Sequence, residues 1–173
     1  MLFRSVLVER AVENRLEVQV GVLGNHTLNV SECEELVRSG SIVSYQEKYS
    51  ENAQPGSADL APSIIPARLP QVLADEVRRL ARDAFKAIDS RGISRVDVLI
   101  DVTRMEPFVN EINTMPGSLS FALWEASGIK PEELVCRLVA LALEAHREKR
   151  VTRFESKEGR ALVDRRHLVT PGK

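Results

Sequence analysis

Hydrophobic and polar residues alternate in three stretches of this chain, which predicts three β-strands. In residues 16–23 (LEVQVGVL) and again in residues 94–101 (SRVDVLID), the apolar side chains fall on one face of an extended chain. In residues 108–113 (FVNEIN), Phe108 and Ile112 alternate with Glu111 and Asn113, which places the polar pair on the other face. A short polar turn separates the last two stretches, so they are expected to pair as a hairpin.

Two further stretches repeat their apolar residues every three or four positions, which predicts amphipathic helices. The first runs over residues 69–88 and should end at Gly92 through a left-handed turn. The second, residues 131–146, has proline and acidic residues at its start. The apolar positions are Leu69, Val72, Leu73, Val77, Leu80, Ala81, Ala84, Phe85 and Ile88 in the first, and Leu134, Leu138, Leu141 and Leu143 in the second.

The remaining segments are less regular. The apolar run at residues 6–9 predicts a short strand, and residues 26–43 fit either a helical turn or a strand. Residues 44–60 are polar and irregular, as functional loops often are. We expect a domain at residues 1–148 and a charged tail at residues 149–173. Strands with a separate set of helices predict an α+β fold, mainly an antiparallel sheet covered by helices.

Composition excludes several classes of function. The 173 residues carry a net charge of −1, which gives no electrostatic basis for binding nucleic acid or an anionic membrane. No apolar run approaches the roughly 20 residues that span a bilayer. The two cysteines, Cys33 and Cys136, have no metal-binding or redox spacing. These features predict a protein of the reducing cytoplasm.

The predicted hairpin carries the candidate chemistry. Arg95 and Asp97 are two residues apart and share a strand face, as do Glu111 and Asn113. Pairing would gather two carboxylates, an amide oxygen and a guanidinium. Such oxygens suit Mg²⁺ together with phosphate, and the guanidinium would neutralise phosphoryl charge. The alternative is an ordinary salt-bridged surface.

The strings GISRVDVLID and VNEINTMPG resemble the C-terminal part of the ATP-grasp domain of D-alanine–D-alanine ligases, and the resemblance extends over residues 6–145. It implies a partial ATP-grasp fold. It further implies that Asp97, Glu111 and Asn113 hold two Mg²⁺ (or Mn²⁺) ions that bridge the phosphates of ATP, and that Arg95 contacts the transferring phosphate.

The same resemblance implies the nucleotide contacts. Glu9 falls on the adenine contact and Glu17 on the ribose contact, although the spacing between them is one residue longer than the family pattern. Val12 and Leu99 fall on further ATP-binding positions. In the YxxKY string of residues 44–60, Lys48 would meet phosphate and Tyr49 would act across a closed active site. Surface charges or a solvated loop are the alternatives.

The loop after the hairpin resembles the family's acceptor-binding loop, with one departure. Gly117 matches the glycine that grips the second D-alanine, but Ala122 stands where the family has a serine. Ser118 or Ser120 would supply the hydroxyl instead. This departure leaves the second substrate open.

The resemblance implies ADP-forming ligation of two D-alanines for peptidoglycan precursors, by a protein that is a homodimer when full-length. An acceptor other than D-alanine, such as D-lactate or D-serine, and a non-catalytic chain are the alternatives. The family's N-terminal domain and first half of the ATP-grasp domain have no counterpart here, so the chain is expected to be a fragment and inactive alone. Its apolar start at residues 6–8 is expected to favour association.

Overall fold

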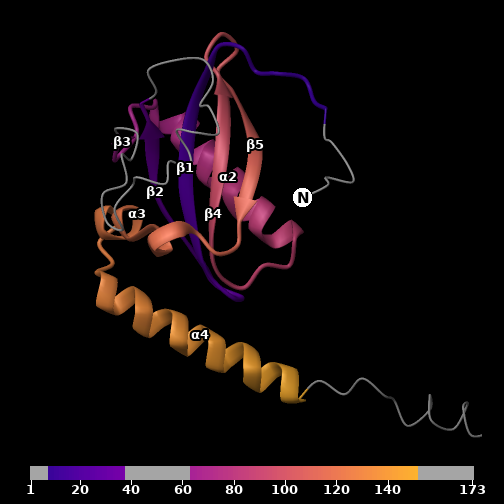
Figure 1. Ribbon diagram of the computed structural model, residues 1–173, viewed down its shortest axis with the longest axis vertical. Coiled ribbons are helices and arrows are strands. Elements are labelled where there is room, and N and C mark those ends of the chain that lie inside the picture. The colour runs from indigo at the N-terminus through magenta and orange to yellow at the C-terminus, as the bar shows by residue number, and fades with distance from the viewer. Residues whose placement is uncertain (1–7, 38–62, 152–173) are drawn as a thin grey trace, which may run out of the picture.

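The computed structural model describes residues 8–37 and 63–151. Its centre is a five-stranded sheet in the order β3-β2-β1-β4-β5, with every neighbouring pair antiparallel (Figure 1). This confirms the α+β class. The strands are β1 (Arg15–Gly24), β2 (Leu28–Leu36), β3 (Ser63–Ile64), β4 (Gly92–Asp101) and β5 (Glu106–Asn113).

Two of the less regular segments are now assigned. Residues 28–36 form strand β2, so the strand alternative for residues 26–43 is correct over that span. The strand predicted at residues 6–9 is wrong where it is described: Val8 and Glu9 are irregular, and Val8 is 89% exposed. Residues 6 and 7 lie outside the described range. A side chain so exposed has no neighbouring strand to pack against.

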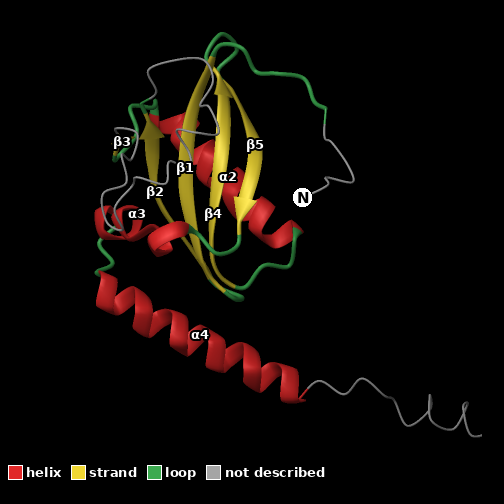
Figure 2. Ribbon diagram, viewed as in Figure 1, coloured by secondary structure: helices red, strands yellow, loops and turns green. Residues whose placement is uncertain are grey.

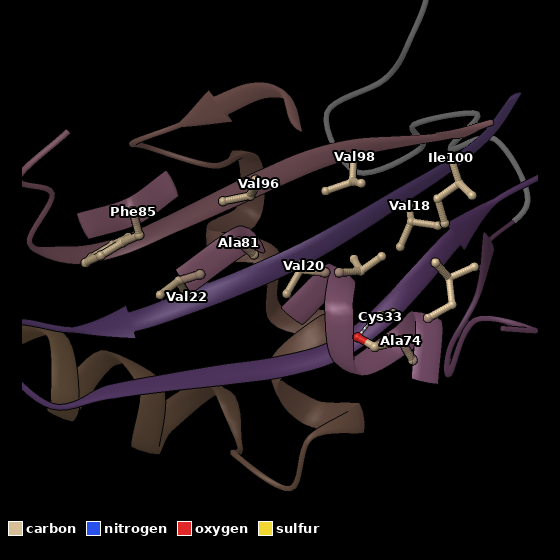
Figure 3. Packing of buried hydrophobic residues seen from close by; sticks show 12 residues of the cluster. Val18, Val20, Val22, Cys33, Ala74, Ala81, Phe85, Val96, Val98 and Ile100 are labelled. Carbon is tan, nitrogen blue, oxygen red and sulfur yellow. Dashed lines mark hydrogen bonds between the residues drawn. The ribbon is translucent and has the colours of Figure 1, made fainter. Parts of the chain in front are cut away.

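Helix α2 (Gln71–Ala87) crosses one face of the sheet, behind the strands in Figure 2. Its buried side chains meet the inward valines of β1 and β4, whose alternation predicted this core (Figure 3). Cys33 on β2 joins the core, and burial raises the pKa of its thiol to about 11. The thiol is therefore neutral at pH 7, as expected of a packing residue. The cluster consists of Val18, Val20, Val22, Cys33, Leu73, Ala74, Val77, Ala81, Phe85, Val96, Val98 and Ile100.

Both ends of α2 differ from the prediction. Val72 is 83% exposed and Ile88 49% exposed, although both fit the helical repeat. Val72 is next to buried Leu73, and adjacent residues on a helix point about 100° apart. The helix ends at Ala87, and the left-handed turn follows at Asp89 (φ 51°). Gly92 also has positive φ (82°), but it starts β4 rather than ending the helix.

Helices α3 (Phe121–Ala126) and α4 (Pro131–Val151) cover the other side and the end of the sheet (Figure 1). They enclose a second buried cluster around Trp124, which is 1% exposed and packs as predicted. Leu134 is buried, whereas Leu143 is 52% exposed, so its predicted packing is wrong. The apolar residues of α4 that belong to or pack against this cluster are Leu134, Leu138 and Leu141. Helix α4 also continues past residue 148 to Val151.

Asn25, in the turn between β1 and β2, links α4 to the sheet. Its Nδ2 donates to the carbonyl of Leu141 (3.0 Å) and to Oε2 of Glu144 (2.7 Å). The backbone N–H of Gly92 donates to Oδ1 of Asn25 at 3.2 Å. These bonds position α4 near the start of β4. No helix in the described parts of the chain is both long and apolar enough to cross a bilayer.

Strand β5 contains a bulge that changes which residues face α2. Asp97 lies opposite Glu111, but the next pair is Val98 with Val109, so Asn110 is an extra residue. Phe108 then lies opposite Leu99, on the same face as Asp97. The simple alternation predicted the opposite face for Phe108, and this prediction is wrong because the bulge reverses the pattern.

Candidate functional site

A row of polar residues crosses the face of the sheet that α2 does not cover. Gln19 on β1 lies opposite Asp97 on β4, and Asp97 lies opposite Glu111 on β5. Two positions along β4, Arg95 lies opposite Asn113. Residues directly opposite in neighbouring strands share a face. The sheet therefore gathers the four residues that the hairpin prediction singled out.

Asp97 is the centre of this row. Its two carboxylate oxygens accept hydrogen bonds from Arg95, from Nε to Oδ1 (2.7 Å) and from Nη2 to Oδ2 (3.0 Å). Nδ2 of Asn113 lies 3.4 Å from Oδ2 of Asp97 and 3.3 Å from Oε1 of Glu111. Nε2 of Gln19 approaches Oδ2 of Asp97 to 3.5 Å. The side chains converge, and they are not separated by apolar atoms.

The electrostatics of the row combine two facing carboxylates with one guanidinium. Burial raises the pKa of the Asp97 carboxyl above its ordinary value, Arg95 acts against this rise, and Glu111 adds to it. The pKa of Arg95 is also raised, chiefly by its hydrogen bond to Asp97. Two carboxylates opposite each other on a half-buried surface repel, and a cation between them would relieve this repulsion.

A pocket of about 320 Å³ adjoins the row and extends toward the segment before β1. Its lining contains every predicted nucleotide-contact residue that the structure describes, together with two of the predicted metal ligands. Of these residues, Glu17 also pairs with Arg15, whose Nε lies 3.1 Å from its Oε1. The lining residues named by the sequence are Glu9, Val12, Glu17, Leu99, Asp97 and Glu111.

Comparison with known proteins identifies the family of this chain. The family described as D-ala D-ala ligase C-terminus matches residues 2–140. This chain belongs to that family. A D-alanine–D-alanine ligase from Solibacter usitatus (strain Ellin6076) is 37% identical over 155 residues, which cover 87% of this chain and 45% of that protein.

Solved structures give the same result for the fold. The D-alanine–D-alanine ligase from Coxiella burnetii aligns with a TM-score of 0.64 and 27% identity, over 82% of this chain and 35% of that one. A D-Ala:D-Ser ligase from Enterococcus faecalis aligns with a TM-score of 0.58 and 28% identity, over 73% of this chain and 36% of that one. The chain thus spans less than half the length of these ligases.

Other predicted residues are not part of the row. Lys48 and Tyr49 lie outside the described residues. Gly117, Ser118 and Ser120 lie in a short 3₁₀ turn (η1, Gly117–Ser120) after β5 and do not line the pocket. Ser118 is exposed, whereas the hydroxyl oxygen of Ser120 is buried and has no hydrogen-bond partner within residues 8–37 and 63–151. The two candidate hydroxyls of this ligase-family loop therefore differ in their surroundings.

The structure adds two residues that sequence reasoning missed. Gln19 lies beside Asp97, and Glu34 on β2 lies opposite Gln19, which extends the row by one strand. The negative charge of Glu34 contributes to the raised pKa of Arg95. The signal for Gln19 was its polar position within LEVQVGVL, on the same face as Glu17. The partners of both residues depend on strand register, which the alternation does not specify.

The donor set fits the metal that the family resemblance implies. Among the described residues, no group of three or more His, Cys, Asp and Glu side chains converges as a metal site. Asp97 and Glu111 provide two carboxylates, and the Asn113 amide carries an oxygen as well as its nitrogen. Mg²⁺ is commonly held by one or two carboxylates with phosphate and water oxygens completing its shell. These residues match that requirement, so they would hold magnesium only together with a phosphate ligand.

Proposed function

We propose that this chain forms the magnesium–triphosphate part of the ATP site of a D-alanine–D-alanine ligase. The observation that carries the proposal is the convergence of Asp97, Glu111 and Asn113 beside Arg95, next to a pocket lined by Glu9. Family membership supports the same assignment. Because the matched ligases are more than twice as long as the aligned region, the complete activity is a proposal about the ligase as a whole.

The proposed reaction has two steps. The γ-phosphoryl group of ATP passes to the carboxylate of one D-alanine, which releases ADP and leaves an acyl phosphate. The amine of the second D-alanine then attacks the acyl carbon, and phosphate leaves with the electron pair of the broken C–O bond. The attacking amine loses a proton, and the product is D-alanyl-D-alanine, a peptidoglycan precursor. We further propose that the ligase is cytoplasmic, because ATP is available there, and that the full-length ligase is a homodimer.

The chain's residues would contribute position and charge. Magnesium, when bound at Asp97, Glu111 and Asn113, offsets the charge of the triphosphate. Arg95 would direct its guanidinium at the transferring phosphoryl group, where negative charge develops. Glu9 would accept a hydrogen bond from the adenine amino group, and Glu17 would bind the ribose hydroxyls. Lys48 and Tyr49 would complete the site from residues outside the described range.

Binding of a magnesium complex of a non-hydrolysable ATP analogue tests this proposal by calorimetry. Asp97→Asn and Glu111→Gln should each weaken binding by about ten-fold or more, about 1.4 kcal/mol, because each removes one anionic ligand. Glu132→Gln, at an exposed position in the first turn of α4, is the matched control and should bind like the wild type. Unchanged affinity in both site variants would refute the metal assignment.

A ligase with a different acceptor is the second candidate. Ala122 in place of the family serine and the unpartnered hydroxyl of Ser120 favour it. We propose Ser120, with Gly117 and Ser118, as the acceptor-binding set. ADP release by a full-length relative, measured with D-alanine, D-serine and D-lactate, decides between the acceptors: strict dependence on D-alanine eliminates the second candidate. A non-catalytic chain is the third candidate, and ADP release by the purified 173-residue chain alone would refute it.

A further inference from the structure

The structure shows Asp97 held by its neighbour rather than open to a cation. The Arg95 guanidinium contacts both oxygens of Asp97, at 2.7 and 3.0 Å, from two residues away on the same strand face. The side chains of this pair are only 22% and 17% exposed. Such two-point pairing is among the stronger ion pairs, and solvent screens it less at a half-buried position.

The other polar neighbours of Asp97 also present donors to it. The amide nitrogens of Asn113 and Gln19 both lie within 3.5 Å of Oδ2, the oxygen that already accepts from Nη2 of Arg95. A divalent cation arriving alone would therefore compete with a guanidinium and two amide donors for the same carboxylate. A triphosphate changes this balance, because it offers the guanidinium another anion of matching geometry.

We propose that Arg95 acts as a latch on the metal site: it occupies Asp97 until a nucleotide's phosphates draw the guanidinium away, so that metal binds together with nucleotide and only weakly alone. The inference rests on the proposed metal role of Asp97. It gives Arg95 a positioning role before nucleotide binds, distinct from its contact with the transferring phosphate. The chain would thereby bind free divalent cations only weakly.

Titration with Mn²⁺ alone, followed by electron paramagnetic resonance of the free ion, tests the latch. Arg95→Lys keeps the positive charge but cannot form the two-point fork, so it should bind Mn²⁺ at least about ten-fold more tightly than the wild type. It should also bind the magnesium complex of the ATP analogue more weakly, because the guanidinium–phosphate contact is lost. A latch predicts that Arg95→Lys gains affinity for the metal alone and loses affinity for the metal–nucleotide complex.

Two controls separate the latch from general effects of charge. Arg104→Lys alters another arginine of the β4–β5 hairpin, whose Nε lies 3.9 Å from Oδ2 of Asp101. This variant should leave Mn²⁺ affinity unchanged. Adding Asp97→Asn to Arg95→Lys should abolish the gain. Equal Mn²⁺ affinity in Arg95→Lys and the wild type overturns the latch. Failure of the wild type to bind the nucleotide complex refutes the proposed function instead, whatever Arg95→Lys does with metal alone.

A measurement on the wild-type chain tests the latch without comparing affinities of variants. The Nε–H of Arg95 donates to Asp97, so its ¹H–¹⁵N signal should be protected from exchange, and it is assigned as the signal missing in Arg95→Lys. Millimolar Mg²⁺ alone should leave this signal in place, whereas the magnesium–nucleotide complex should shift it. A shift of equal size with Mg²⁺ alone contradicts the latch.

Discussion

Gly21 is the residue at which the site face of the sheet meets the second core. It lies opposite Arg95, and its N–H donates to Oγ of Ser31 at 2.8 Å. A Cβ at this position would lie 2.8 Å from Cζ2 of Trp124 and 3.0 Å from Cε2. The absent side chain thus allows the buried indole to lie directly against β1, beside the polar row.

Gly21→Ala should lower the free energy of unfolding by about 1–3 kcal/mol, because the added methyl group overpacks a rigid indole. Urea denaturation measures the change. Gly117→Ala is the matched control, and its stability should stay near that of the wild type. Apart from its chain neighbours, no atom of the described residues lies within 4 Å of the Cβ position there. Equal stability of Gly21→Ala and Gly117→Ala would contradict the close packing of Trp124.

Glu35 is a buried carboxylate with 4% of its side chain exposed, and Arg68 pairs with it. The backbone N–H of Arg68 donates to Oε2 at 3.1 Å, its Nε donates to the same oxygen at 3.0 Å, and its Nη2 donates to Oε1. These bonds, the side-chain ones above all, lower the pKa of Glu35 below its ordinary value of 4.5. The stabilisation is therefore present above pH 4.5 and is lost as pH falls through the lowered pKa.

Glu35→Gln should reduce stability at pH 7. Its stability should also fall less steeply than that of the wild type as the pH is lowered below about 5, because the variant has no carboxylate to protonate at this position. Thermal unfolding across this pH series measures both effects. Glu125→Gln, at an exposed site on α3, should follow the wild-type pH dependence. A Glu35→Gln curve parallel to that of the wild type would contradict the assigned role of Glu35.

At the scale of elements, the bulge in β5 decides how the hairpin presents the site. Asn110 is extra relative to β4, so the strand pairs in register both before and after it. The bulge also turns Phe108 onto the site face beside Leu99. Bulges bend a strand locally and re-aim its side chains, and Glu111 is the next residue.

Deletion of Asn110 should leave a folded chain, because removing the unpaired residue keeps both flanking registers. It should weaken binding of the magnesium–nucleotide complex, because without the bulge the strand is straight and the Glu111 side chain points in a different direction. Cooperative urea unfolding and calorimetry report the two effects. Deletion of Val98, a paired core residue on β4, should prevent folding because it reverses the faces of neighbouring residues. A folded deletion variant with unchanged nucleotide affinity would refute the role of the bulge.

At the scale of the whole molecule, the two faces of one sheet have different roles. Helix α2 closes one face with the main core, whereas the other face carries the polar row, the pocket and, at its end, α3 and α4. A ligand bound to the folded state alone stabilises it, by about 2.7 kcal/mol at 100 times its dissociation constant. The proposed site therefore makes a prediction about the stability of the entire chain.

Saturating magnesium with the ATP analogue should raise the melting temperature, and a chelator should abolish the increase, because triphosphate without metal leaves the two carboxylates uncompensated. Calorimetric melting of the wild type measures this effect. The Asp97→Asn variant should show little increase with either mixture. An increase that survives removal of the metal would contradict magnesium-dependent binding.

Alternation and helical repeats determined β1, β4, most of α2 and the start of α4, because burial of one face imposes a period on the sequence. Spacing on two strands likewise grouped Arg95 with Asp97 and Glu111 with Asn113. Only the tertiary structure decided the bulge at Asn110, the exposure of Val72 and Leu143, and the partners Gln19 and Glu34. These features depend on register and on which surfaces meet, and such contacts join residues far apart in the chain.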